Sequence, residues 1–538
     1  MTVSRRAGLT AIAVAALAAG VLTQLGARHT SATFDEIILV SGGVRGITEG
    51  RWGMVTDQPP LMMYAYGLAA VTADPVRPRE DREWTFDDRW DYARALLFRL
   101  GNEPTELLAR ARFVGTVLVV VLVAVAGAFA WWIAGPFAGA VAASFTALLP
   151  DVLAHGGVAY NDLPLALAYL LAVWALDSAV RVPTPWRGAL AGLAVTAAFG
   201  IKMSALALVP VAGLLIVGGA WPHRRDTEWL RSLAISLAVG ALVFYVAFVV
   251  LYRGDPTLTL FRFNFWRTVL HASGGHEAPA YLLGETSASG WWYYYPVAFF
   301  FKTSAAFQVL VGAAATGLVA AWVNGGRSVE KLLRWRGRSA LLGVLVFAAF
   351  MMRSDLNAGF RYALPTLPLL AVLAAVGAVR VWRNSGRLVR AGLAGLLALQ
   401  AFSVLSVYPH FLAYTSVWAG GRDSAYRVLA DSNIDWGQGL LALEEFVEDE
   451  GVPSVRLSYF GSAVPDAYGI EYVALPSFFR LDYERTPGAE VSPRFTVISA
   501  TNLQGLYLQG RDPFASYRAR EPYRVLGHSL FVFDEEGS

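Results

Sequence analysis

Long apolar stretches, each ended by a short polar segment, recur along residues 1–408. A helix needs about 20 predominantly apolar residues to cross the hydrocarbon core of a bilayer. The stretches therefore predict membrane-spanning helices, although 187–221 also fits one hairpin of short helices. We predict about eleven spans, at residues 8–27, 113–134, 136–152, 160–180, 187–201, 203–221, 231–252, 297–323, 339–352, 361–381 and 389–408.

The loops between these spans alternate in charge. RVPTPWR, WPHRRDTEWLR, NGGRSVEKLLRWRGR and RVWRNSGRLVR are rich in Lys and Arg, as cytoplasmic loops of membrane proteins are. We therefore place the N-terminus in the cytoplasm and residues 28–112, 253–296, 353–360 and all those after 409 on the outer face. This predicts a multi-pass protein of the cell membrane with its C-terminal part on the periplasmic or extracellular side.

The N-terminal stretch SRRAGLTAIAVAALAAG has two interpretations. Its basic start, apolar run and small residues fit a cleaved signal peptide, and more loosely a twin-arginine signal. A multispanning body follows directly, so we prefer a retained first helix anchored in the cytoplasm by Arg5 and Arg6.

The outer segments have their own patterns. QPPLMMYAYGLAAV (58–71) is apolar but too short to span, and FDDRWDYARALLFRLG (86–101) mixes charged and apolar residues at helical spacing. Both predict helices lying in the membrane interface. The run WWYYYP (291–296) resembles the aromatic belt found where a chain re-enters the bilayer.

After residue 409 the hydrophobic runs shorten and the charges increase. SVRLSYF, RFTVISA and YRVLGHSLFVFD are typical of strands, and GLLALEEFVEDEG is typical of a helix. We predict a soluble α/β domain over 409–538, large enough for its own core. The predicted fold class is an α-helical polytopic membrane protein, residues 1–408, with this C-terminal domain.

Amino-acid composition narrows the possible protein classes and partners further. The 538 residues are 56% hydrophobic and 16% charged, which excludes an ordinary soluble domain. The chain has no cysteine, which excludes disulfides, thiolate metal sites and a cysteine nucleophile. No basic tract with interleaved aromatic residues is present, so nucleic acid is not an expected partner.

Polar residues gather at the predicted outer ends of the spans, where ionisable groups are functional candidates. A cavity at the outer leaflet would account for all of them, since they come from distant loops on one surface. They are Asp35 and Glu36 after the first span, Asp162 opening the fourth, Lys202 between the fifth and sixth, Lys302 in the eighth, Asn357 before the tenth, and Arg361 and Tyr362 at the start of the tenth.

Each candidate also has a simpler interpretation. Asp162 suits the cap of a helix, Lys302 could extend to the lipid headgroups, and Arg361 could be an anchor. Asp35 and Glu36 are adjacent, so their side chains point in different directions. One of the pair would face a reacting group, while the other would orient a loop, a metal or a sugar hydroxyl.

Five segments in this order resemble the GT-C membrane glycosyltransferases that use polyprenyl-phosphate sugars, specifically the protein O-mannosyltransferase-like group of glycosyltransferase family 39. They are FDE (34–36), DQPPL (57–61), AYNDLPL (159–165), WWYYYPVAFFFKTS (291–304) and NAGFRYALPTLPLL (357–370). LADSNIDWGQGLLAL (429–443) is similar to a segment of bacterial and archaeal members, which favours a prokaryotic protein.

The resemblance implies a function. A sugar, mannose or another hexose, would move from a polyprenyl phosphate to a hydroxyl of a protein, lipid or glycan acceptor with inversion at the anomeric carbon. Asp35 occupies the position of the family's general base, and Asp162 that of its second-loop acid. Two features depart from the family. Gln58 stands where a histidine is common, and the C-terminal domain does not resemble the trefoil of the eukaryotic enzymes.

The residue types suggest roles within such a reaction. Asp35, Glu36 and Asp162 form the candidate catalytic set. Arg361 is the first candidate for the donor phosphate because its guanidinium can bind phosphate in a bidentate manner, followed by Lys302 and Lys202. Glu36 and Asp162 are also candidate oxygen ligands of a divalent metal cation.

The acceptor or sugar has a second group of candidates. They combine acids, amides and aromatic rings, which suit hydroxyl recognition and stacking. An alternative for DSNIDWGQG is a turn before a helix that Asp435 caps. The candidates are Asn357, Tyr362, Asp431, Asn433, Asp435, Trp436 and Gln438.

Two other functions remain open. A transporter or channel for a lipid or solute would also need many spans and charges in the membrane. The charges lie at one face rather than at the midplane, and there is no internal repeat of the kind many transporters have. A membrane-anchored binding protein would leave the charges of the membrane part unexplained.

Overall fold

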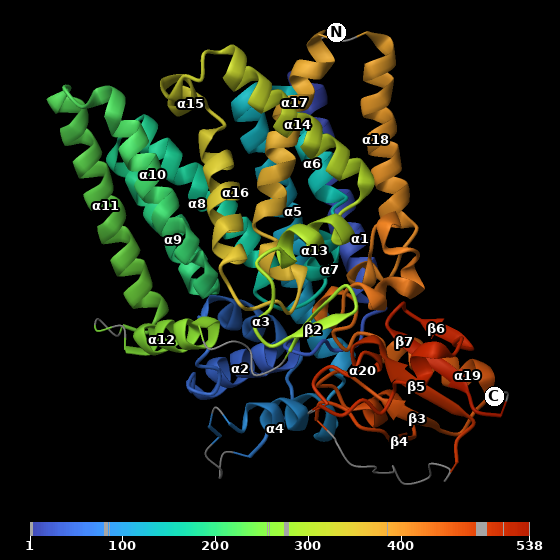
Figure 1. Ribbon diagram of the computed structural model, residues 1–538. Helices are drawn as coiled ribbons and strands as arrows, with labels where there is room; N and C mark the ends of the chain where they lie inside the picture. Colours follow the sequence, from blue (N-terminus) through green and yellow to red (C-terminus); the bar gives the residue numbers. More distant parts are fainter. Residues whose placement is uncertain are drawn as a thin grey trace.

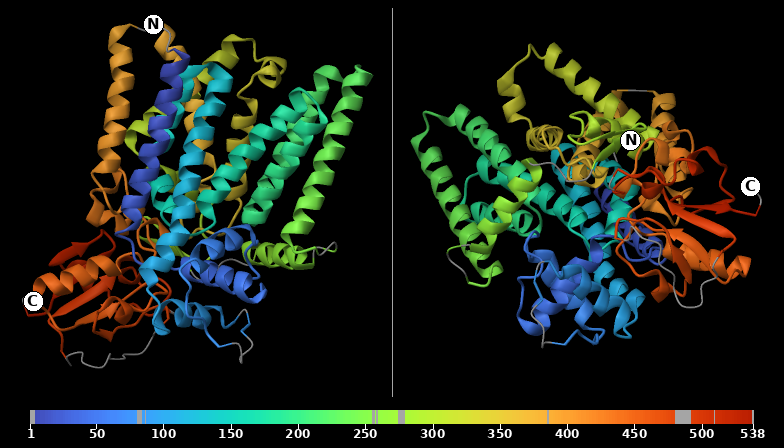
Figure 2. Two further views of the ribbon diagram at one scale, coloured as in Figure 1. Left: turned by 180° about the vertical axis from the view of Figure 1, so that it is seen from behind. Right: turned by 60° about the horizontal axis from the view of Figure 1, so that its bottom comes forward.

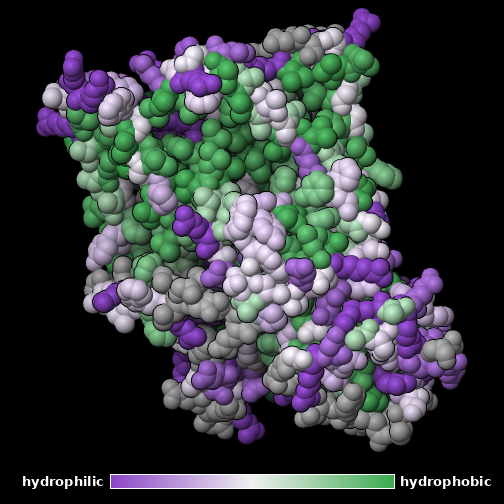
Figure 3. Space-filling model, viewed as in Figure 1, coloured by the Kyte–Doolittle hydropathy of each residue, from purple (hydrophilic) through white to green (hydrophobic). Residues whose placement is uncertain are grey.

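The structure is a computed structural model that describes residues 4–79, 84–85, 87–254, 257, 259–273, 279–384, 386–479, 492–508 and 510–536. Most of the chain forms a bundle of long helices, and a small sheet lies beyond one end of it (Figure 1). Figure 3 shows that this face of the bundle is largely apolar along its middle, while polar residues gather at its ends and over the sheet.

Each predicted span coincides with helical structure. Seven helices in the described part of the chain are long and apolar enough to cross a membrane, and the bent pair α6–α7 makes eight. The protein is therefore a multi-pass membrane protein. The seven are α1 (Arg5–Ala27), α5 (Pro104–Ala134), α8 (Asp162–Arg181), Met203–His223 with α10 (Leu208–Ala220) at its centre, α11 (Thr227–Leu251), α14 (Ala305–Asn324) and α18 (Arg387–Leu405). The three others are α9 (Pro185–Ile201), α16 (Arg338–Met352) and α17 (Thr366–Asn384), whose apolar part is Thr366–Trp382.

Two predicted spans are broken rather than continuous. The stretch 136–152 is split into α6 (Pro136–Ala147) and α7 (Pro150–Gly156), which meet at 62°. Pro150 cannot donate a backbone hydrogen bond, so it starts a new helix. The stretch 297–323 is split into α13 (Tyr294–Lys302) and α14, whose first turn is capped by the Ser304 hydroxyl.

The bundle has two different ends. In Figures 1 and 2 the N-terminus and α15 (Val329–Arg334) lie at one end, and the C-terminal sheet lies at the other. Four helices cross that second end: α2 (Glu36–Glu49), α3 (Leu61–Val71), α4 (Arg89–Arg94) and α12 (Thr259–Ser273). Helices α3 and α4 fall in the predicted interfacial segments, and α4 continues into the π-helix η1 (Ala95–Arg99). The sequence analysis did not predict α2.

Within the described residues the C-terminal sheet contains five strands in the order β4-β3-β5-β7-β6. β3 (Val455–Ser458) is parallel to β4 (Tyr472–Ala474) and β5 (Phe495–Ser499), whereas β7 (Leu530–Asp534) is antiparallel to β5 and β6 (Arg524–Leu526). With α19 (Leu440–Glu450) and α20 (Ala500–Leu503), the sheet confirms the predicted α/β fold; the boundary at 409 stays a prediction. A separate hairpin pairs β1 (Ala280–Leu282) with β2 (Glu285–Ser287).

The segment before α19 lies against the first outer loop. Ser31 donates from its hydroxyl to Gly437 O at 2.9 Å, and Phe34 N donates to Trp436 O at 2.8 Å. These backbone contacts fix the start of α2 beside the segment 431–438. They place Asp35, the residue before α2, at the junction of the bundle and the C-terminal part.

Candidate functional site

Asp35 and Glu36 point to different partners, as expected for adjacent residues. Glu36 is fully buried and accepts hydrogen bonds from Arg112 Nε at 2.8 Å and Arg112 Nη2 at 2.7 Å. It also accepts from Thr33 N at 3.1 Å and Ala159 N at 2.7 Å. Asp35 keeps 20% of its side chain exposed and accepts from Arg361 Nη2 at 3.1 Å. Of the two carboxylates, only Asp35 can meet a substrate in this geometry.

Glu36 therefore has a structural role here, and we revise its prediction as a catalytic or metal-binding residue. Its two oxygens bind Arg112, and through Ala159 they tie the start of α2 to the loop before α8. The spatial neighbour Arg112 was missed because the predicted span began one residue after it.

Arg361 is the centre of the polar cluster. It lies in the short helix η4 (Phe360–Ala363), and 5% of its side chain is exposed. Its Nη1 donates to Asp162 Oδ2 at 3.2 Å, and its Nη2 donates to Asp35 Oδ2 at 3.1 Å. Lys202 Nζ donates to the other oxygen of Asp162. Two cations and two carboxylates thus form one chain of contacts, which we name the Arg361 cluster: Asp35, Arg361, Asp162 and Lys202.

Local structure sets these four side chains in place. Asp162 is the first residue of α8, and Lys202 occupies the break between α9 and the following 3-10 turn. Arg361 is positioned by the close approach of Gly359 to Ser432, because a Cβ at Gly359 would lie 2.1 Å from the Ser432 hydroxyl oxygen. Ser432 also accepts from Arg361 Nε at 3.0 Å. The start of α8, the break after α9 and the close contact at Gly359 therefore bring Asp162, Lys202 and Arg361 together.

Aromatic rings line the cluster. The Arg361 guanidinium lies 4.1 Å from the Trp436 ring centre and 4.7 Å from that of Tyr362. Trp436 is 1% exposed, so it packs beneath Arg361 and cannot stack on a sugar in this arrangement. The Tyr362 hydroxyl accepts from Arg361 Nη2 at 3.2 Å, and its ring lies 4.3 Å from Lys202 Nζ. Tyr362 is partly exposed and stays a candidate for sugar contact.

Lys302 does not belong to this cluster. Its ammonium is 1% exposed and donates to three backbone carbonyls, those of Leu412 and Tyr414 at 2.9 Å and of Asn433 at 2.6 Å. Lys302 thus holds the segment after α18 against α13. We revise its prediction as a phosphate ligand, since all three donors are engaged, and it does not extend to the headgroups either.

Most of the predicted acceptor-binding side chains are engaged within the protein. Asn433 accepts from Phe360 N at 2.9 Å and donates to the Tyr294 hydroxyl at 2.9 Å. Asn357 accepts from Trp291 N at 2.7 Å, and Gln438 bonds the backbone of its own turn. These three amides join loops to one another, so we revise their prediction as sugar ligands.

The segment 431–438 has two acids, of which Asp435 is buried and Asp431 is half-buried. Asp435 accepts from Thr501 N at 3.1 Å, and burial raises the pKa of its carboxyl to about 7. It makes no cap for α19, whose N-cap residue is Gly439. Asp431 accepts from the Tyr507 hydroxyl, and burial raises its pKa to about 6 while the charge of Arg361 opposes the rise. Asp431 therefore lies within electrostatic reach of the cluster, whereas Asp435 supports the turn.

Asp57 lies within electrostatic reach of Asp35, and the sequence analysis did not single it out. Burial raises the pKa of this carboxyl, Arg89 lowers it, and the charge of Asp35 raises it further. The next residue, Gln58, accepts from Asn161 Nδ2 at 3.0 Å. The motif DQPPL was the available signal for Asp57.

Glu36 and Asp162, the two predicted metal ligands, are not arranged to bind a metal cation. The carboxylate of Glu36 is bound by Arg112, and that of Asp162 by Arg361 and Lys202. Among the described residues no group of three or more His, Asp or Glu side chains is arranged to hold a metal ion. We derive no step through a metal.

Comparison with known proteins supports the architecture. No family model and no curated protein matches the sequence. The apo crystal structure of ArnT from Cupriavidus metallidurans is similar over 96% of this chain and 97% of that one, with 14% identity and a TM-score of 0.50. The chain has the GT-C fold.

Two further GT-C structures align less closely. ArnT bound to undecaprenyl phosphate covers 98% of both chains at 13% identity, with a TM-score of 0.47. The Saccharomyces cerevisiae Pmt1-Pmt2 O-mannosyltransferase complex covers 47% of this chain and 34% of that one at 18% identity, with a TM-score of 0.37. The similarity to apo ArnT, at 14% identity, shows the fold alone.

Proposed function

We propose that this protein is a membrane glycosyltransferase that transfers a sugar, mannose or another hexose, from a polyprenyl phosphate to a hydroxyl of a protein, lipid or glycan acceptor. The observation that carries the proposal is the Arg361 cluster. A partly exposed carboxylate and two cations meet at one end of a GT-C bundle, beside a folded C-terminal domain. We place this end on the outer face of the cell membrane, following the distribution of basic loops.

Asp35 is the proposed general base. Its carboxylate is 20% exposed, so an acceptor hydroxyl can approach it. It takes the hydroxyl proton while the acceptor oxygen attacks the anomeric carbon. The bond from that carbon to the phosphate oxygen breaks, and its electron pair leaves with the polyprenyl phosphate. A single displacement of this kind inverts the anomeric centre.

Arg361 and Lys202 are the proposed ligands of the phosphate. Asp162 contacts both, which holds two cations side by side before the donor arrives. Fixed cations stabilise the negative charge that develops on the leaving oxygen, and they need no reorganisation during the reaction. A phosphate oxygen that accepts a hydrogen bond from Arg361 Nη2 competes with Asp35 for that N–H group. Donor binding would thus free Asp35 to act as base.

An apolar groove gives room for the prenyl chain. It has a volume of about 840 Å³ and lies between α14, α16 and α17, where Leu370 and Gly377 line it. It extends to Lys331 of α15 at the end of the bundle opposite the Arg361 cluster. Helix α17 begins shortly after Arg361 and runs along this groove, so Leu370 lies in the first turns of the helix that follows the proposed phosphate site.

The test is turnover of a panel of radiolabelled polyprenyl-phosphate sugars by the purified protein in native-like lipid, with crude extract as acceptor source. Wild type is compared with Asp35→Asn and with Asp449→Asn, an exposed carboxylate on α19. Release of polyprenyl phosphate by wild type and Asp449→Asn, but not by Asp35→Asn, supports the proposal.

The other outcomes are also informative. Equal turnover by Asp35→Asn moves the base elsewhere, with Asp162 next. No turnover of any donor by wild type contradicts the transferase. Solute movement in vesicles without donor consumption would then establish the transporter.

A further inference from the structure

Gln58 of the first outer loop carries a hydrogen-bond donor that the fold does not use. Its side-chain oxygen accepts from Asn161 Nδ2 at 3.0 Å, and we name these two residues the amide pair. The side-chain nitrogen of Gln58 has no hydrogen-bond partner in the described part of the chain. Because the side chain is only half-buried, a ligand can reach this nitrogen. Its N–H groups suit an oxygen acceptor such as a hydroxyl.

The backbone that carries Gln58 is restrained on both sides. Pro59 follows it, and a residue that precedes a proline is kept out of helical conformations. Helix α3 comes next, and its Tyr66 hydroxyl donates to Tyr160 O at 2.8 Å. This contact and the amide pair together hold the start of α3 against the loop before α8. The free nitrogen of Gln58 is therefore presented from a fixed position.

Asn161 is a buried residue whose side chain is only half satisfied. It is 0% exposed, and among the described residues its Oδ1 has no hydrogen-bond partner. A buried polar atom without a partner destabilises the fold, so such atoms are rare. An apolar residue at this position would avoid the cost but would leave Gln58 without its anchor. The cost is explained if Asn161 positions Gln58, since unfavourable local features persist where function needs them.

Asn161 lies beside the two proposed phosphate ligands. The ring centre of the residue before it, Tyr160, lies 5.3 Å from the Arg361 guanidinium and 5.7 Å from Lys202 Nζ. The residue after it, Asp162, accepts hydrogen bonds from both cations. Asn161 is thus flanked on each side by a residue that contacts both cations. The amide pair therefore adjoins the place where the donor phosphate is proposed to bind.

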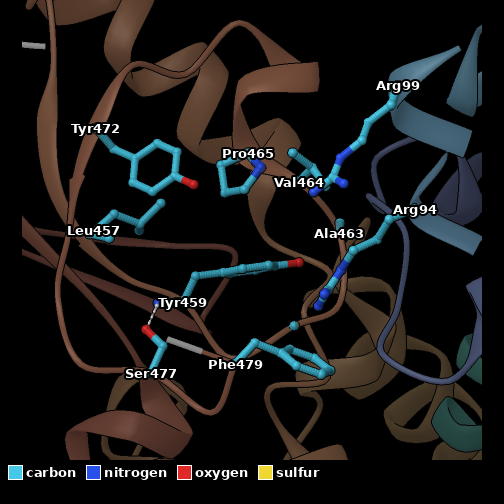
Figure 4. A pocket seen from close by; sticks show the side chains of 12 residues that line it. Arg94, Arg99, Leu457, Tyr459, Ala463, Val464, Pro465, Tyr472, Ser477 and Phe479 are labelled. Carbon is cyan, nitrogen blue, oxygen red and sulfur yellow. Dashed lines mark hydrogen bonds between the residues drawn. The ribbon is translucent and has the colours of Figure 1, made fainter. Parts of the chain in front are cut away.

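The proposed base is near the same loop. Asp57, which precedes the amide pair, lies within electrostatic reach of Asp35. Phe34 O accepts from the Ser462 hydroxyl at 2.6 Å, and the Phe34 ring stacks on Phe479 with centres 5.3 Å apart. Figure 4 shows Phe479 at the cavity between the first outer loop and the C-terminal sheet. The C-terminal part therefore fixes the backbone before the base, and the loop with the amide pair lies near its charge.

The sugar of the donor must lie between the phosphate ligands and the base. Its anomeric carbon is bonded to the phosphate oxygen and is attacked by the hydroxyl that Asp35 deprotonates. We infer that Gln58 donates a hydrogen bond from its side-chain nitrogen to a hydroxyl of this sugar, and that Asn161 is the positioning residue that orients Gln58.

This contact selects among donors. A site built to bond a hydroxyl discriminates against a sugar that lacks it, because the site's own polar group then stays unpaired. The donor is thus a polyprenyl phosphate whose sugar has a free hydroxyl at this place. The inference rests on the proposed function for the kind of donor, but the contact can be measured as binding, without turnover.

The first experiment compares two lipids. The full-length protein in lipid nanodiscs is titrated with bare polyprenyl phosphate and with the polyprenyl-phosphate sugar of the panel that binds most tightly. Gln58→Leu should lower the affinity for the sugar-bearing lipid about fivefold, the effect of one neutral hydrogen bond, and leave that for the bare lipid unchanged. Gln308→Leu, a half-buried glutamine on α14, should behave as wild type. An equal effect of Gln58→Leu on both lipids overturns the contact.

Monodeoxy sugars identify the hydroxyl. One monodeoxy donor should bind wild type about fivefold more weakly than its parent. The same donor should bind wild type and Gln58→Leu equally, because the hydrogen bond is already absent. Wild type that binds every monodeoxy donor as tightly as the parent overturns the contact, whether or not the variant folds. A sugar preference lost in Gln58→Leu, without any turnover by wild type, would sink the transferase and leave the sugar contact.

The positioning role is tested with Asn161→Ala. This variant should weaken the sugar-bearing lipid by the same factor as Gln58→Leu, and the double variant should lose no more than either single variant, because both remove one contact. Thermal unfolding of the same preparations is the second readout. A lower Tm with an unchanged preference for the sugar would make Asn161 a structural residue and overturn its positioning role.

Discussion

The guanidinium of Arg361 lies between the carboxylates of Asp35 and Asp162, with donor distances of 3.1 Å to the first and 3.2 Å to the second. The three residues come from the first outer loop, the start of α8 and the turn before α17. One arginine thus joins the proposed base to the proposed phosphate site. Its substitution should therefore affect both donor binding and chemistry.

Arg361→Lys should lower kcat by about 10²–10³, the effect of removing one preorganised donor from a developing charge. A lysine keeps the charge but cannot bond Asp35 and Asp162 through a planar fork. The measurement is steady-state kinetics with varied donor. Arg225→Lys, at an exposed position before α11, serves as the matched control. Unchanged kcat and donor KM in Arg361→Lys would remove Arg361 from the mechanism.

Glu36→Gln should destabilise the protein by about 3 kcal/mol, since it leaves the buried charge of Arg112 without a counterion. Asp35→Asn should cost far less, because Asp35 is partly exposed. Thermal unfolding in detergent compares the two. The double variant Glu36→Gln/Arg112→Met should recover part of the loss. A Glu36→Gln protein that is as stable as wild type but inactive would return Glu36 to the catalytic set.

Lys302→Met should destabilise the packing of the segment after α18 by about 2 kcal/mol or more, because three carbonyls lose a charged donor. The donor KM of the folded fraction should not change. Limited proteolysis near residue 412 and donor kinetics on the same preparation separate the two effects. A large increase in donor KM with unchanged proteolysis would restore Lys302 as a phosphate ligand.

The stability of the C-terminal part should depend on pH through Asp435. Its folded-state pKa of about 7 lies above the ordinary 3.8, so between those values the folded state binds more protons than the unfolded state. Stability should fall as pH rises from about 4 to 7, by at most about 1.4 kcal/mol per unit, and level off above. Asp435→Asn should flatten this slope and exposed Asp449→Asn should not, as denaturant titrations at several pH values can test.

The orientation can be tested without background, because the chain has no cysteine. Ser516→Cys lies on the C-terminal part, and Thr227→Cys lies at the start of α11; both positions are exposed. A membrane-impermeant maleimide applied to intact cells should label the first and not the second. The reverse pattern would place the Arg361 cluster on the cytoplasmic face.

The sequence was sufficient for the features that depend on local composition. The spans follow from apolar length, and both sets of loops follow from charge, because the bilayer acts on each segment separately. The strands and α19 were predictable from their own patterns for the same reason. The sequence also brought Asp35, Asp162, Lys202 and Arg361 into one candidate list, since all four are costly at a membrane surface.

Only the tertiary structure decided which polar residues form the cluster and which hold the protein together. Glu36 and Asp35 are both carboxylates, yet Arg112 binds Glu36 while Asp35 stays partly exposed. Lys302 and Lys202 were both candidate phosphate ligands in the sequence, but the ammonium of Lys302 donates to three backbone carbonyls. The reason is that a buried charge must find partners, and those partners are brought near by packing between segments far apart in the chain. Sequence patterns therefore predicted the membrane-spanning helices, and tertiary packing determined which acid can meet a substrate.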